Sequence, residues 1–157
     1  MNYHNIKHDD MLNGDGLRVT LFVSGCEHNC PGCQNPGTHP VDSGIPFDEE
    51  AEKELFEELD KDYISGITFS GGDPCHPQNI KTIFGLMLKV KMLHPDKTIW
   101  LYTGYTLPEI NKMEFGPAII NLVDVFVEGK FVQALADINA PWVGSTNQNV
   151  VRKGDYL

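Results

Sequence analysis

The stretch LRVTLFVSGCEHNCPGCQN, from Leu17 to Asn35, joins a strand pattern directly to a loop with three cysteines. Its first part, LRVTLFV, is apolar and β-branched, and it predicts a buried strand over Leu17–Val23. Cys26, Cys30 and Cys33 follow, with three residues in the first gap and two in the second. Clustered thiols can bind a metal or a cluster. The stretch therefore predicts a central strand with a site at its carboxyl end.

Outside this stretch, strand and helix patterns alternate along the chain. Apolar and β-branched residues predict further strands over Gly66–Ser70, Thr98–Thr103 and Leu122–Val127. Capping signals and apolar residues at helical spacing predict three intervening helices, which begin after Asp48, near Ile80 and after Thr106. This order predicts right-handed crossovers and a mainly parallel sheet, which is an α/β fold. The 157 residues suit one domain, 1–157.

Composition narrows the classes of partner. The chain carries 12 Lys and Arg residues against 22 Asp and Glu residues, a net charge of -10, so no nucleic-acid partner is expected. Much of this charge lies in Asp48–Asp62, which predicts a solvated helix face or a docking face for a partner. The first ten residues show no secretory pattern, and no apolar run approaches a membrane span. We therefore expect a cytoplasmic protein with no membrane partner.

Three segments marked by glycine each follow one of the predicted strands. They are SGC at 24–26, SGGDP at 70–74 and TGY at 103–105. In folds with parallel strands, the chemistry gathers at the carboxyl ends of the strands. We therefore expect these segments to contribute to one site.

The clustered cysteines allow more than one chemistry. In a reducing compartment, metal binding or catalysis is more common than a disulfide. A structural zinc ion could use the three thiolates with His28 or His39, although the usual two-knuckle spacing is missing. Cys30 and Cys33 alone would form a thiol redox pair, which leaves Cys26 without a role. A [4Fe-4S] cluster held by three thiolates would keep one iron open, and an open position usually marks catalysis.

The cysteine spacing in a loop after the first strand resembles that of the radical S-adenosylmethionine superfamily. In that superfamily the amino and carboxylate groups of S-adenosylmethionine occupy the open iron. The segment SGGDP, Ser70–Pro74, resembles the glycine-rich motif that follows the second strand there. Two glycines allow close approach to a ligand, and Asp73 can accept a charge-assisted bond from its ammonium group. The resemblance implies a short, open partial (β/α) barrel of the radical S-adenosylmethionine type.

One departure from the wider superfamily points to a branch of it. Gly32 stands before the third cysteine, where the superfamily usually has an aromatic residue. PGC followed by QN instead resembles the activating proteins of anaerobic ribonucleoside-triphosphate reductases. Cys75 departs from that branch, which more often has a bulky apolar residue there, and we interpret it as a packing residue rather than a fourth ligand. Further stretches that resemble the branch are MNYHNIK (1–7), NGDGLR (13–18), GGDPCHPQN (71–79), IWLYTGY (99–105), VEGKF (127–131) and VGSTNQ (143–148).

The resemblance implies an enzyme that activates a glycyl-radical reductase. Reductive cleavage of S-adenosylmethionine at the [4Fe-4S] cluster would give a 5′-deoxyadenosyl radical, which removes a hydrogen from a glycine of the reductase. A small reducing protein such as a flavodoxin would supply the electron. Two alternatives stay open: a radical S-adenosylmethionine enzyme that acts on a small molecule, and a zinc-binding interaction module.

The same resemblance implies a role for each part of the site. The cluster ligands would be Cys26, Cys30 and Cys33. Backbone beside S-adenosylmethionine would come from Gly32, Cys33 and Gln34, and its methionine end would be held by Gly71, Gly72 and Asp73. No protein acid or base is needed, so no catalytic residue is expected beyond the cluster and the cofactor.

Neighbouring residues carry weaker expectations. Tyr102 and Gly104 would line the pocket, although Tyr102 could equally be a half-buried strand residue. His28 is expected to face solvent, and His76 and His94 are expected to lie on the polar surface.

Overall fold

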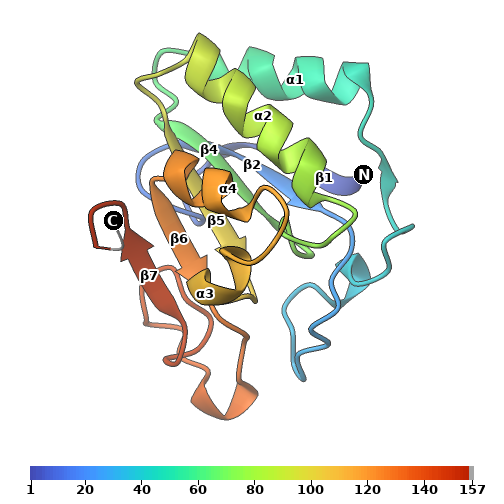
Figure 1. Cartoon of the computed structure of the whole chain (residues 1–157), viewed down its shortest axis with the longest axis vertical. Helices are drawn as coiled ribbons and strands as arrows, with labels where there is room; N and C mark the ends of the chain where they lie inside the picture. Colours follow the sequence, from blue (N-terminus) through green and yellow to red (C-terminus); the bar gives the residue numbers. More distant parts are fainter. Residues whose placement is uncertain (156–157) are drawn as a thin grey trace.

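A computed structural model describes residues 1–155, which form one seven-stranded sheet and four α-helices (Figure 1). The strands, in chain order, are β1 (Asn2–Asp10), β2 (Arg18–Val23), β3 (Ile45–Pro46), β4 (Gly66–Gly71), β5 (Thr98–Thr103), β6 (Val125–Glu128) and β7 (Asn149–Arg152). The helices are α1 (Glu49–Leu59), α2 (Ile80–Leu93), α3 (Leu107–Ile110) and α4 (Gly116–Leu122), with short 3-10 turns η1 (Pro36–Thr38) and η2 (Gln133–Leu135). The sheet order is β3-β1-β2-β4-β5-β6-β7.

The central strands β2, β4, β5 and β6 are parallel, and they follow one another in the sheet in chain order. Right-handed crossovers that all step in one direction bring the connecting helices to one face of the sheet. Figure 1 shows α2 and α4 lying across that face. Antiparallel strands flank the centre, and the sheet stays open between β3 and β7. The predicted α/β class with its parallel centre is confirmed.

Alternate residues of the central strands serve opposite faces of the sheet, as the pleat requires. Leu21, Phe69 and Leu101 are buried in the core beneath the helices. Leu55 of α1 and Met87 of α2 complete that core from the helix side. The helix face is therefore sealed by apolar packing, and the opposite face is left to polar and ring contacts.

Arg18 organises the opposite face, and its side chain is fully buried. Its Nε donates to Thr68 Oγ1 at 2.8 Å, and a terminal nitrogen donates to the carbonyls of Ile67 and Thr98. The guanidinium lies 5.6 Å from the centroid of the Trp100 ring. Burial lowers the pKa of this guanidinium to about 10. These contacts tie β2, β4 and β5 together on the open face.

Most of the predicted elements are confirmed with small shifts at their ends. β5 has the predicted bounds, β2 begins at Arg18, and β4 runs on to Gly71. Asp48 caps α1, since its Oδ1 accepts from Ala51 N at 2.9 Å. The capping box expected between Thr106 and Glu109 is present at α3.

The strand expected over Leu122–Val127 is wrong in its first half. Leu122 is the last residue of α4, and β6 begins only at Val125. Gly116 and Pro117 start this helix, so the apolar residues after them are helical.

The sequence patterns also missed α4 itself and the three strands that pair antiparallel. β1 reads NYHNIKHDD, and most of its side chains are exposed or half-buried, so it lacks an apolar alternation. Its pairing with β2 contains two register shifts, which further blur the pattern. Within the described part of the chain, no helix is long and apolar enough to cross a membrane.

Candidate functional site

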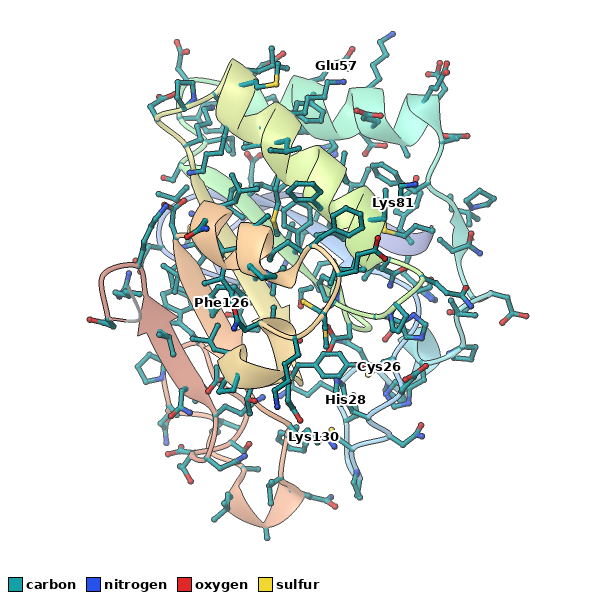
Figure 2. All side chains as sticks on the ribbon, in the orientation of Figure 1. Cys26, His28, Glu57, Lys81, Phe126 and Lys130 are labelled. Carbon is teal, nitrogen blue, oxygen red and sulfur yellow. The ribbon has the colours of Figure 1, made fainter. Side chains whose placement is uncertain are left out.

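A cavity of about 480 Å³ lies at the carboxyl ends of the parallel strands. Such a volume is in the range of pockets that bind small molecules and cofactors. Figure 2 shows Cys26 and His28 at this end of the sheet. Of the predicted site residues and their expected neighbours, those that line the cavity are Cys26, Cys30, Cys33, Gln34, Gly71, Gly72, Asp73, Tyr102 and Gly104. The three glycine-marked segments therefore meet, as expected.

The three clustered cysteines are not in disulfides, are partly exposed and all line this cavity. A turn from Cys33 N to Cys30 O at 3.1 Å orders the second half of the loop. Burial raises the pKa of the Cys26 thiol to about 11. A cluster would remove that proton, because the thiolate is the form that binds metal. The donor set, three thiols beside open space, thus fits a [4Fe-4S] cluster with one free iron.

Within residues 1–155, no three His, Cys, Asp or Glu side chains converge closely enough to hold one metal ion. A cubane is larger than a single ion and takes one thiolate on each of three irons, so its ligands stand further apart.

Cys75 lies elsewhere. It is buried in the helix-side core, and burial raises the pKa of its thiol well above the ordinary value. This position supports its interpretation as a packing residue.

The glycines of SGGDP bring two backbone segments together. Gly72 N donates to Val23 O, and Asp73 N donates to Gly25 O, both at 2.7 Å. A Cβ on Gly72 would lie 2.6 Å from Gly25 O, closer than real side chains approach. Gly71 has φ +103° and packs against Val23 in the same way. The pair is therefore needed for contact between the ends of β2 and β4, besides any contact with a ligand.

Asp73 lies beneath the cavity and is almost fully buried. Its Oδ1 accepts from Cys75 N and Thr103 Oγ1, both at 2.9 Å, and its Oδ2 accepts from Gly104 N at 2.9 Å. His28 Nε2 lies 2.7 Å from the same Oδ2. One carboxylate thus joins the cysteine loop, the SGGDP segment and the end of β5.

The expectation that His28 faces solvent is wrong. Only 6% of its side chain is exposed, because the ring turns inward to Asp73 and packs edge-on against Tyr105. His76 is also buried, and its Nδ1 accepts from Gln78 N at 3.1 Å, so the expected surface position is wrong as well. Polar residue type alone suggested exposure. Each ring also has a partner that is distant in sequence, Asp73 for His28 and Glu27, 3.4 Å away, for His76.

Gly32 does not line the cavity. It has φ +74°, and a Cβ there would meet the side chain of Gln133 in η2. The cysteine loop therefore packs against the segment between β6 and β7 at this point. That packing gives a second reason for glycine before the third cysteine.

A wall of the cavity comes from residues 129–148, for which the sequence patterns predicted no part in the site. Gln148 Oε1 accepts from Gly144 N at 2.8 Å, and Gln148 Nε2 donates to Gly129 O at 2.8 Å. Ser145 Oγ accepts from Val132 N at 3.1 Å. Hydrogen bonds thus hold VEGKF (127–131) and VGSTNQ (143–148) side by side. Wall residues that line the cavity include Phe131, Ile138, Trp142 and Gly144.

Tyr102 lines the cavity from β5, as one of its two interpretations required. Its hydroxyl oxygen is buried and has no hydrogen-bond partner among the described residues. Burial raises the pKa of this phenol above its ordinary value.

The comparisons with known proteins agree with this site. The family described as 4Fe-4S single cluster domain matches residues 12–151. The chain is 46% identical over 152 residues to the anaerobic ribonucleoside-triphosphate reductase-activating protein of Escherichia coli (strain K12), covering 96% of this chain and 97% of that protein. Proteins with the same name from Pasteurella multocida (strain Pm70) and Enterobacteria phage T4 are 41% and 43% identical, and the matches cover 99% and 96% of this chain and 100% and 93% of theirs.

Proposed function

Because this chain belongs to the family of the anaerobic ribonucleoside-triphosphate reductase-activating proteins, with a 4Fe-4S single cluster domain over residues 12–151, we propose that it generates a glycyl radical on such a reductase. One observation carries the proposal to the level of residues. The three cysteines of the loop and the SGGDP segment, 37 or more positions apart in the chain, line one cavity. One pocket thus contains thiols that could bind a cluster and two glycines that allow close approach of backbone. This arrangement supports a cofactor bound between them.

In this proposal Cys26, Cys30 and Cys33 hold a [4Fe-4S] cluster and leave one iron open for S-adenosylmethionine. The cluster and S-adenosylmethionine, when bound, would supply reductive cleavage of the sulfonium to methionine and a 5′-deoxyadenosyl radical, so the bond-breaking chemistry belongs to the cofactors. The open sheet would then be the short partial barrel of the radical S-adenosylmethionine type.

The chain itself binds, orients and excludes water. Gly71 and Gly72 let backbone come close to the methionine end of S-adenosylmethionine. Cys33 and Gln34 line the same cavity and would offer backbone to the ligand, whereas Gly32 packs against Gln133 and does not line the cavity. These residue assignments are predictions that the arrangement supports.

The substrate of the radical is a protein in this proposal. Met11, Leu12 and Ile138 line the mouth of the cavity and are 66%, 73% and 100% exposed. Apolar residues at a mouth suit a protein surface that covers it and keeps water from the radical. A small reducing protein such as a flavodoxin would deliver the electron, and the protein would act in the cytoplasm.

The decisive experiment follows the radical. Anaerobic incubation with the reductase, S-adenosylmethionine and a reductant is expected to give an organic radical signal on the reductase. Deuterium at its target glycine is expected to pass into 5′-deoxyadenosine. Consumption of a small metabolite without a radical on the reductase would replace the proposal with a small-molecule radical enzyme.

A further inference from the structure

His28 occupies the middle of the three-residue gap between the first two cysteines. Its ring is buried in the fold, whereas the neighbouring residues Glu27 and Asn29 are exposed. The loop is also attached by Cys26 N, which donates to His39 O, and by the packing of Gly32 against Gln133. His28 is the attachment that lies between the first two thiols, so it influences where both of them lie.

The attachment point is Asp73. Because the other groups bound to this carboxylate are N–H and O–H donors, the imidazole Nε2 at 2.7 Å acts as a donor too. The carboxylate is 2% exposed, so this hydrogen bond is sheltered from water. Buried hydrogen bonds to charged groups are among the stronger ones in proteins.

The surroundings are shaped for this ring. Tyr105 contacts it edge-on, with the ring centroids 4.4 Å apart. On another side, any Cβ at Gly104 would collide with the imidazole carbon Cδ2. The TGY segment after β5 therefore supplies both a ring to pack on and the space for the imidazole.

The carboxylate has no capacity left over. A carboxylate offers about four acceptor sites. Four donors from different groups already approach it: Cys75 N, Thr103 Oγ1, Gly104 N and His28 Nε2. An ammonium group could bind here only by displacing one of them.

We propose that His28 is the positioning residue of the site, which acts through Asp73 to set the distance between the cysteine loop and SGGDP. This inference rests on the proposed function, since S-adenosylmethionine would have to reach the open iron and the Gly71–Gly72 backbone at once. Asp73 then works by holding His28 rather than by touching the ligand.

The test compares two substitutions with a matched control. His28→Leu removes the donor at similar size, and His28→Gln restores an N–H donor. His94→Leu is the control, because His94 Nε2 also bonds an aspartate, Asp60, at 2.6 Å. These two residues lie at the ends of α2 and α1, and neither lines the cavity. Each variant is measured as metal-free protein by hydrogen exchange, and after anaerobic reconstitution by iron content and by the change that S-adenosylmethionine causes in the spectrum of the reduced cluster.

For His28→Leu we expect faster exchange over residues 26–33 and at least about tenfold weaker S-adenosylmethionine binding, with iron largely retained. His28→Gln should recover much of both, and His94→Leu should match the parent protein. Unchanged exchange in His28→Leu, or equal losses in the Leu and Gln variants, would overturn the inference. If the parent protein binds no S-adenosylmethionine, the proposed function fails, and the exchange result still decides whether His28 orders the loop.

Discussion

The four cysteines occupy two chemically different environments. Cys26, Cys30 and Cys33 are partly exposed at the cavity, whereas Cys75 is 1% exposed in the apolar core. Metal ligands need access to the ion and freedom to deprotonate, and burial denies the Cys75 thiol access and raises its pKa. Position in the fold therefore supports the proposed roles of the three cavity cysteines as ligands and of Cys75 as a packing residue.

Replacing Cys30 by Ala is expected to abolish retention of the [4Fe-4S] cluster, because two thiolates cannot hold it. Cys75→Ala is the matched control and should keep its iron, at a stability cost of about 1 kcal/mol for a small cavity. Iron and sulfide analysis after anaerobic reconstitution measures both. A full cluster in Cys30→Ala, or loss of iron in Cys75→Ala, would reverse the assignment.

Gly72→Val is expected to weaken S-adenosylmethionine binding while the cluster persists. The new Cβ would press on Gly25 O, so the ends of β2 and β4 would move apart and widen the cavity. The cysteines themselves are untouched. Titration of the reduced, reconstituted protein with S-adenosylmethionine measures this, and wild-type affinity would remove SGGDP from the site.

Elements with strong local signals could be predicted from the sequence. The N-cap at Asp48, the capping box at Thr106 and the apolar runs of β2, β4 and β5 specify themselves locally. β1 and β7 could not be recognised, because partly exposed strands gain their stability from pairing with β2 and β6 rather than from pattern.

The residues of the site also divide into those with a local sequence signal and those without one. The thiols and SGGDP were visible because adjacent residues carry the signal. The His28–Asp73 bond joins residues 45 positions apart, and the Gly32–Gln133 contact spans an even longer separation, so the sequence alone could not reveal them. Only the tertiary fold determines such partners.

Gly85 offers a test of α2 as an element. It is exposed in the middle of the helix, and a Cβ there would meet nothing within 4 Å. Gly85→Ala is therefore expected to stabilise the protein by about 0.5–1 kcal/mol through helix propensity. Thermal or denaturant unfolding measures the change in stability, and the affinity for S-adenosylmethionine should stay the same. A lower melting temperature would mean that α2 needs a flexible point here.

At the scale of the whole molecule, the exposed apolar side chains of the described residues include two groups that lie apart. Met11, Leu12 and Ile138 surround the cavity mouth, whereas Met92 and Leu93 are exposed at the end of α2. In a chain of net charge -10, apolar side chains at the mouth favour a protein partner over a charged small molecule there. The second group provides a control of equal chemistry.

The double substitution Leu12→Ser with Ile138→Ser is expected to lower reductase activation by about tenfold, or about 1.4 kcal/mol of docking energy. Cleavage of S-adenosylmethionine in the absence of reductase should persist, because neither side chain is a ligand in the proposal. Met92→Ser with Leu93→Ser should leave both unchanged. Equal activation by the mouth variant would mean that the reductase docks on another surface.

The open sheet ends in two short strands, and β3 pairs with only the first two residues of β1, so the rest of β1 also lies at an edge. That part of β1 carries the charged residues Lys7, Asp9 and Asp10, and its pairing with β2 contains two register shifts. β3 has two residues and β7 has four, with Asn149 and Arg152 at its ends. Long, flat edges are the surfaces on which sheets of separate molecules add to one another, and native proteins blunt them by brevity and charge. The same architecture that leaves the cavity open to a partner therefore offers little template for aggregation through cross-β pairing.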